Sequence, residues 1–179
     1  MSAVVSETCN QIAKAMLLDP LPGQADGMWQ SAIAGVPYSD TPPDPIALIP
    51  RAARGDAEAQ FELARMALYE ALAAFQEGPV RLLCEGLIFA RMAASHGDEE
   101  AVMLLITMLS FGATILPEPD ARECAAEVVA WLELLADRKG EIGENASRLV
   151  VQCAEREPAE TLELAKIYRA RMAAATGER

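Results

Sequence analysis

The feature that most restricts the fold of this chain is an internal repeat of about 42 residues. The pair Gly55-Asp56 recurs as Gly97-Asp98. The boundary glycines of the repeat are 42, 43 and 37 residues apart: Gly55, Gly97, Gly140 and Gly177. A repeat of this length predicts an array of helix pairs, in which each pair buries its apolar face against its neighbours.

Each boundary contains residues that end one helix and begin the next. Glycine adopts the left-handed conformation that closes a helix, and the acidic residue after it caps and charges the first turn of the following helix. Each glycine therefore marks the end of a second, or B, helix and the start of a first, or A, helix. The A helices are expected near 56–74, 98–111 and 142–155, and the B helices near 79–96, 119–139 and 158–176.

Prolines set the first 50 residues apart from the rest. Seven of the eleven prolines fall between Pro20 and Pro50. Residues 19–50 are therefore expected to form an irregular connector, with one short helix near Trp29 as an option. An amphipathic helix is expected before it, over residues 4–18.

Beyond residue 50 the prolines mark helix starts. The first turn of a helix tolerates proline because its missing N–H has no partner there. Four prolines fit such positions: Pro79, Pro117, Pro119 and Pro158. No hairpin turn joins alternating β-branched segments, so no strand is expected. The expected domains are 1–50, an N-terminal helix and connector that pack on the array, and 51–179, the repeat domain.

Composition and charge narrow the classes of partner. Hydrophobic residues make up 52% of the chain and aromatic residues only 5%, which favours many small contacts between close helices. The net charge of −12 argues against nucleic acid and anionic membranes, which require a cationic surface. The N-terminus lacks the positive charge of a signal peptide. The longest uncharged run, 101–117, is shorter than the roughly 20 residues of a membrane span. A cytoplasmic protein without membrane contact is expected.

The sequence contains no recognisable catalytic or metal-binding motif. His96 is the only histidine, which argues against histidine-dependent catalysis and multi-histidine metal sites. Its position before Gly97 predicts that it caps a helix C-terminus. Acidic pairs such as Glu123 and Glu127 are interpreted as solvated helix faces. We expect no catalytic residue, no cofactor and no metal.

The cysteines are interpreted as small buried hydrophobic residues. They lie far apart, without the Cys-x-x-Cys spacing of a zinc or redox site: Cys9, Cys84, Cys124 and Cys153. Neither a disulfide framework nor a zinc site is expected from this spacing.

The alanine and aromatic pattern resembles the Sel-one-like repeat, a branch of the tetratricopeptide-like superfamily, over residues 45–177. The alternative is that alanine-rich helices of any bundle would show this pattern. The segment A-R-M-A-A at 90–94, which recurs at 170–174, argues against such a coincidence. The chain departs from the family where Ala64 and Ile106 replace glycine. The resemblance implies an all-α, right-handed superhelical array (an α/α solenoid) of about three helix pairs, with an N-terminal helical or irregular extension. It also implies a protein-binding scaffold without catalytic residues. The matching positions are Ala59, Gln60, Leu63, Phe89, Ala93, Ala94, Gly97, Ala101 and Leu105.

Arrays of this kind bind a peptide or helix of a client protein in a concave groove lined by their A helices. The expected client is amphipathic or mildly basic. The alternative is that Phe61, Met103 and Phe111 are simply core residues. Helical spacing from Leu63, Leu105 and Val150 nominates the groove and rim residues: Glu58, Phe61, Arg65, Leu68 and Tyr69, then Glu100, Met103, Thr107 and Phe111, then Asn145, Arg148, Gln152 and Glu155.

Three functions are compatible with these residues. A non-enzymatic interaction module is the first and is expected. A small acidic secretion chaperone of tetratricopeptide-like type is the second, since size and charge suit that class. An enzyme with an unrecognised carboxylate site is the third, and no residue in the sequence is nominated for it.

Overall fold

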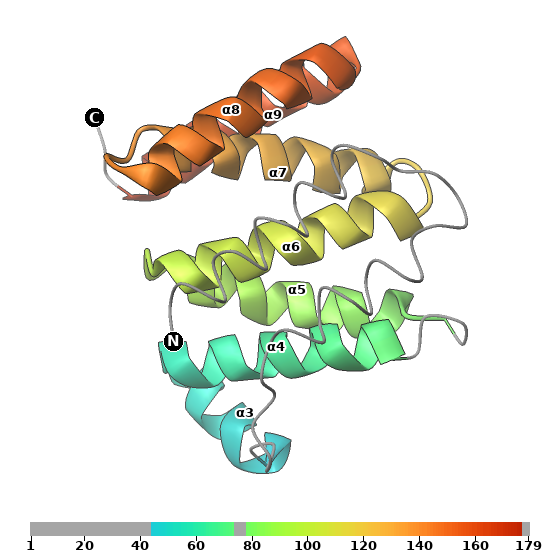
Figure 1. Ribbon diagram of the computed structural model, residues 1–179. Coiled ribbons are helices and arrows are strands. Elements are labelled where there is room, and N and C mark those ends of the chain that lie inside the picture. Colours follow the sequence, from blue (N-terminus) through green and yellow to red (C-terminus); the bar gives the residue numbers. More distant parts are fainter. Residues whose placement is uncertain (1–43, 74–77, 177–179) are drawn as a thin grey trace. The chain divides into compact units, whose positions relative to one another are not determined.

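The computed structural model describes residues 44–73 and 78–176, which form seven α-helices and contain no strand (Figure 1). This confirms the all-α prediction, and the helices coincide with the expected A helices (α4, α6, α8) and B helices (α5, α7, α9). The predicted helices over 4–18 and near Trp29, and the boundary at Gly177, lie outside the described residues. The helices are α3 (Pro45–Ala53), α4 (Ala57–Ala73), α5 (Val80–Ala94), α6 (Glu99–Ile115), α7 (Asp120–Ala136), α8 (Glu141–Arg156) and α9 (Ala159–Thr176).

Helix α3 corrects the expectation that the chain is irregular up to residue 50. The Asp44 carboxylate accepts the Ile46 N–H at 2.9 Å and so caps the helix. Pro45 occupies the first helical position, where its fixed φ suits a helix and its missing N–H leaves no acceptor unpaired. The proline-rich region is therefore not irregular throughout, because Pro45 and Pro50 belong to α3.

The prolines after residue 50 lie at helix starts, as predicted. Pro79 and Pro119 are the N-cap residues of α5 and α7. Pro158 directly precedes α9. The carbonyl of Pro117 accepts the Ala121 N–H at 3.1 Å, in the first turn of α7. Proline thus locates three of the helix starts in this chain.

The chain divides into two compact units after Met108, within α6. In the first unit, α3 packs against α4 and α4 packs against α5. Phe89 of α5 packs against a cluster of buried residues from α3 and α4, so this core joins three helices. The cluster consists of Leu48, Ala52, Ala59, Leu63 and Met66.

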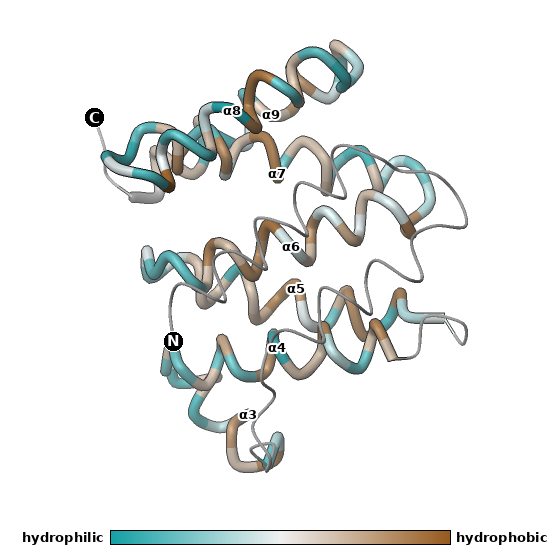
Figure 2. The backbone as a smooth tube through the Cα atoms, viewed as in Figure 1, coloured by the Kyte–Doolittle hydropathy of each residue, from teal (hydrophilic) through white to brown (hydrophobic). Residues whose placement is uncertain are grey.

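In helix α6 every residue from Ala101 to Gly112 is buried, whereas Glu100 near its start and Thr114 near its end are exposed. A helical segment with no exposed position is typical of a core helix. Figure 2 shows more hydrophilic residues, in teal, along α8 than along α6. Within the described ranges, none of the helices combines the length and the apolar content that a bilayer crossing requires.

In the second unit, α7 packs against both α8 and α9. Leu132 and Leu135 of α7 are buried, and so is Ala165 of α9. Arg169 of α9 forms ion pairs with Glu133, at 3.3 Å, and with Asp137, at 2.6 Å. These ion pairs connect the C-terminal half of α9 to the C-terminal half of α7.

One acidic residue and one cysteine differ from the sequence-based interpretation. Glu127 is buried in α7, although it was assigned to a solvated face. Cys84 is exposed on α5, although it was expected to be buried. Cys124 and Cys153 are buried as predicted, and burial raises the pKa of the Cys153 thiol to about 12. Cys9 lies outside the described residues.

The connection between α7 and α8 is unusually tight. Gly140 has a positive φ of 96°, which favours glycine. Three residues later, a Cβ atom placed on Gly143 would lie 1.9 Å from the carbonyl oxygen of Arg138. The first turn of α8 therefore folds against the backbone of the preceding turn, with no room for a side chain.

Substitution Gly143→Ala is expected to lower the free energy of unfolding by about 2 kcal/mol, because the backbone must move to relieve the overlap. Helix propensity alone predicts the opposite sign, a gain of roughly 1 kcal/mol. Urea unfolding followed by circular dichroism measures the difference. Val151→Ala, at an exposed position of the same helix, is the control and should change stability by about 0.5 kcal/mol or less. A Gly143→Ala protein as stable as this control would contradict the close contact.

The three described cysteines should differ in their rates of alkylation in the folded protein. Cys84 should react rapidly with iodoacetamide because its thiol is exposed. Cys124 and Cys153 should be protected, since the thiolate is the reactive form and burial disfavours it. Peptide mapping by mass spectrometry measures each rate, and denatured protein, in which all thiols react, is the control. Equal rates at Cys84 and Cys153 would show that α8 does not pack as described.

Candidate partner-binding surface

The corner between α3 and α4 sets the direction of the first A helix. Gly55 has a φ of 88°, and its N–H bonds to the carbonyl of Ala52 at 3.0 Å. The Asp56 N–H bonds to the carbonyl of Arg51 at 3.2 Å. Together these two bonds form the Schellman motif, which closes a helix with a left-handed residue. The Asp56 carboxylate then accepts the Ala59 N–H at 3.1 Å and caps α4.

The same corner recurs between α5 and α6. Gly97 has a φ of 80°, and the Asp98 carboxylate accepts the Ala101 N–H at 3.0 Å. This confirms the predicted roles of glycine and aspartate at both boundaries. The third boundary differs, because Gly140 is itself the N-cap of α8 and no side chain caps that helix. Charge from Glu141 and Glu144 in its first turn partly takes the place of the cap.

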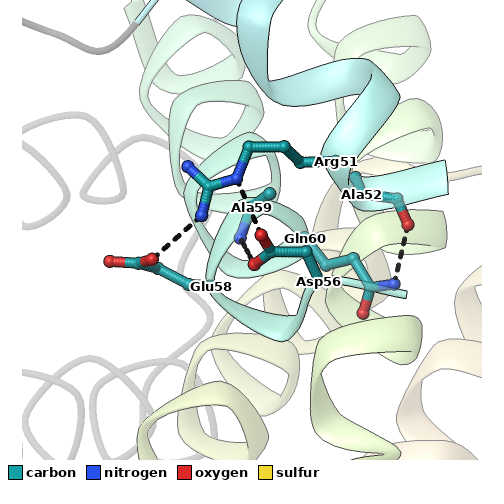
Figure 3. Close-up of polar contacts among 6 residues, drawn as sticks. All are labelled: Arg51, Ala52, Asp56, Glu58, Ala59 and Gln60. Atoms are coloured by element: carbon teal, nitrogen blue, oxygen red, sulfur yellow. Dashed lines mark hydrogen bonds and ion pairs between the residues drawn. The ribbon is translucent and has the colours of Figure 1, made fainter. Parts of the chain in front are cut away.

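Arg51 links the first corner to the rim of the predicted groove (Figure 3). Its Nε donates to Asp56 at 2.7 Å, and its Nη2 donates to Glu58 at 3.1 Å. The hydrogen bond from Arg51 and the one from the Ala59 N–H hold the pKa of Asp56 below its ordinary value. Glu58 is therefore engaged within its own unit, and its charge is partly neutralised at the rim.

A buried glutamine connects α3, α4 and the turn that follows α5. Gln60 is only 2% exposed, and its Nε2 donates to the carbonyl of Ala52 at 3.0 Å. Its Oε1 lies 3.1 Å from Nε2 of His96. Because a carbonyl can only accept, the amide nitrogen must face Ala52 and the imidazole must donate to Oε1. His96 thus bonds across to α4 with its ring, rather than capping the carbonyls of its own helix as the sequence suggested.

On α4, four nominated residues lie at helical spacing on accessible positions. Glu58 is exposed, and Phe61, Arg65 and Tyr69 are half-buried. Arg65 pairs with Glu62 at 2.5 Å. Leu68 is buried, so it belongs to the core. Positions three and four residues apart are neighbours on a helix surface, so the remaining four form one continuous strip.

On α6, the nominated side chains are core residues, with the exception of Glu100. Phe111 and Thr107 are 0% and 2% exposed, and Met103 is also buried. The Thr107 hydroxyl donates to the carbonyl of Met103 at 2.9 Å. Side chains without accessible surface cannot meet a peptide, so these three leave the candidate surface. The alternative interpretation of Met103 and Phe111 as core agrees with their burial.

On α8, Arg148 and Glu155 are exposed, while Asn145 and Gln152 are half-buried. Arg148 donates to the side-chain oxygen of Asn145. The Oε1 atom of Gln152 is buried and accepts no hydrogen bond from the described part of the chain. Buried acceptors normally have a donor, which makes Gln152 the most unusual of the nominated residues in the second unit.

Compared with family models, curated proteins and solved structures, the chain matches none of them. In residues 44–73 and 78–176, no group of histidine, cysteine, aspartate and glutamate side chains is arranged to hold a metal ion. The accessible candidate positions therefore rest on the described geometry of each unit taken separately: α4 and Glu100 in the first unit, and α8 in the second.

Replacing Asp56 by asparagine should reduce stability at about pH 7 and have a smaller effect under acid conditions. A carboxyl with a lowered pKa stabilises the fold above its unfolded pKa of about 3.9 and loses this contribution as the pH falls through the folded value. The difference in free energy of unfolding between wild type and Asp56→Asn should therefore become smaller toward about pH 2. Urea midpoints at several pH values measure it. Glu58→Gln, which removes only the outer partner of Arg51, should show a smaller gap at every pH. A gap independent of pH would contradict the Arg51–Asp56 interaction.

Proposed function

We propose that the chain is a non-enzymatic protein–protein interaction module of the Sel-one-like type, in which helix pairs form a right-handed α/α solenoid. In this proposal the module binds a peptide or helix of a client protein on the face formed by its A helices. The client is an amphipathic or mildly basic segment.

The repeated corner is the observation that carries the proposal. Gly55-Asp56 recurs as Gly97-Asp98 after 42 residues. In each pair the glycine is left-handed, and the aspartate carboxylate accepts the N–H of the third residue after it. Two corners that share a left-handed glycine and an aspartate cap, each followed by an A helix, support a structural repeat rather than a chance likeness in composition. Arrays of helix pairs commonly present extended binding surfaces.

In the first unit, the strip on α4 supplies the apolar part of the proposed contact. Phe61 and Tyr69 are half-buried, so each side chain is partly packed and keeps some accessible surface. Aromatic residues held in this way are common anchors for a partner, because little side-chain entropy remains to be lost on binding. Arg65 lies between them at helical spacing and adds a charged position.

In the second unit, α8 supplies a polar surface. Gln152 is half-buried, so part of its side chain is accessible, although its Oε1 is buried without a donor in the described residues. Arg148 and Glu155 lie four residues before and three residues after Gln152, and both are exposed. Polar groups of this kind set the register of a bound segment rather than its affinity.

The charge of the chain favours a client that is not acidic. The net charge is −12, and Glu100 and Glu155 are exposed on A helices. Such a field speeds the approach of basic segments and slows that of acidic ones, and salt weakens both effects.

The proposal can be tested by photo-crosslinking in lysate of the native host. A photoreactive phenylalanine analogue replaces Phe61, Tyr69 or Gln152 in turn, and Ile88, which is exposed on α5, in the control. One protein should be captured from the three A-helix positions and not from Ile88. Capture from Ile88 alone would place the contact on the B helices and contradict the proposed face.

The client found in this way then allows a quantitative measurement. Phe61→Ala combined with Tyr69→Ala should weaken binding at least ~10-fold, because anchors of this type contribute about 2 kcal/mol or more. Glu155→Gln should change mainly the salt dependence. Thermal unfolding of each variant separates lost binding from lost folding. A client that stays soluble or is exported only with this protein would favour the secretion-chaperone alternative.

A further inference from the structure

One face of α3 is not covered by the other described residues. Leu48 and Ala52 are buried against the rest of the first unit. The opposite side of the helix carries Ile46, which is 77% exposed, and Ile49, which is 52% exposed, together with the exposed Pro50. Ile46 has the largest exposed fraction of the large hydrophobic residues in the described ranges. An apolar face on a surface helix is typical of a contact site.

The charges of α3 are ordered along the helix axis. Asp44, the N-cap residue, is exposed at the N-terminal end, and Arg54 is exposed at the C-terminal end. The Asp44 carboxylate accepts the Ile46 N–H. Neither Asp44 nor Arg54 forms an ion pair with another residue in the described ranges. At 1.5 Å per residue the two ends are roughly 15 Å apart.

We propose that α3 packs antiparallel against α3 of a second copy of this chain, about a two-fold axis near Ile49. Asp44 of each copy then lies beside Arg54 of the other, and Ile46 and Ile49 pack between these two charged ends. A two-fold contact requires a surface that complements itself. The order acid, apolar, base fulfils this requirement only when the helices run in opposite directions, which also opposes their dipoles.

The second copy is favoured over a client because it supplies the matching order of charges by symmetry. The contact is small, since α3 has nine residues and a stable interface buries about 800 Å² on each partner. The dimer is therefore weak, with a dissociation constant on the order of 100 μM. This inference does not depend on the proposed function, because the α3 face contains none of the α4 or α8 residues assigned to client binding.

Sedimentation equilibrium of the full chain, from about 10 μM to about 1 mM, tests the proposal. Wild type should show a monomer–dimer equilibrium. Ile46→Glu combined with Ile49→Glu should lower the association constant at least ~10-fold, since it places charges in the apolar centre. Ile88→Glu is the matched control, because Ile88 is 58% exposed on α5 of the same unit and lies outside the contact. It should associate like wild type.

A charge exchange tests the antiparallel direction. Asp44→Lys alone and Arg54→Asp alone should each associate more weakly than wild type, because each places like charges at both ends of the contact. An equimolar mixture of the two variants should associate more tightly than either one, since opposite charges then meet at both ends. Three results would overturn the proposal: wild type monomeric at about 1 mM, unchanged association of the Ile46 and Ile49 variant, or a mixture no tighter than its components.

Discussion

The corner formed by a left-handed glycine and the aspartate after it is the interaction on which the first unit depends. At Gly55 and Asp56 the chain leaves α3 and enters α4 with the terminal carbonyls of one helix and the first amides of the next both bonded. A side chain at the glycine position would add roughly 1–2 kcal/mol of strain. The direction of α4, and therefore the position of every residue on it, follows from this one reversal of the chain.

Asp56 bonds to two residues of this corner, Arg51 and Ala59, through its N–H and both carboxylate oxygens. Its backbone N–H closes α3, one carboxylate oxygen caps α4, and the other accepts from Arg51. Gln60, one turn later, bonds back to Ala52 and across to His96. Backbone geometry and side-chain bonds thus specify the same arrangement of α3, α4 and the turn after α5. Such agreement across levels is what gives a sequence a single fold.

The helix limits could be predicted because their signals are local. Glycine, aspartate and proline act within a few residues of where they stand, and the same logic applied to Asp44-Pro45 would have found α3. Burial could not be predicted in the same way. The apolar pattern of α6 runs around the whole helix, so no periodicity distinguishes a groove side from a core side, and Phe111 and Met103 were placed in the groove. The bond from His96 to Gln60 joins residues 36 positions apart, and no local pattern indicates it.

The burial of every residue from 101 to 112 in α6 has a consequence for how this sequence can drift in evolution. A helix with a solvent-facing stripe tolerates many exchanges there, but from Ala101 to Gly112 no position is exposed. Each exchange in this segment must keep both volume and apolar character, or be matched by a change in a neighbour. Relatives of this protein should therefore share α6 and the corner glycines long after the polar positions of α8 have diverged.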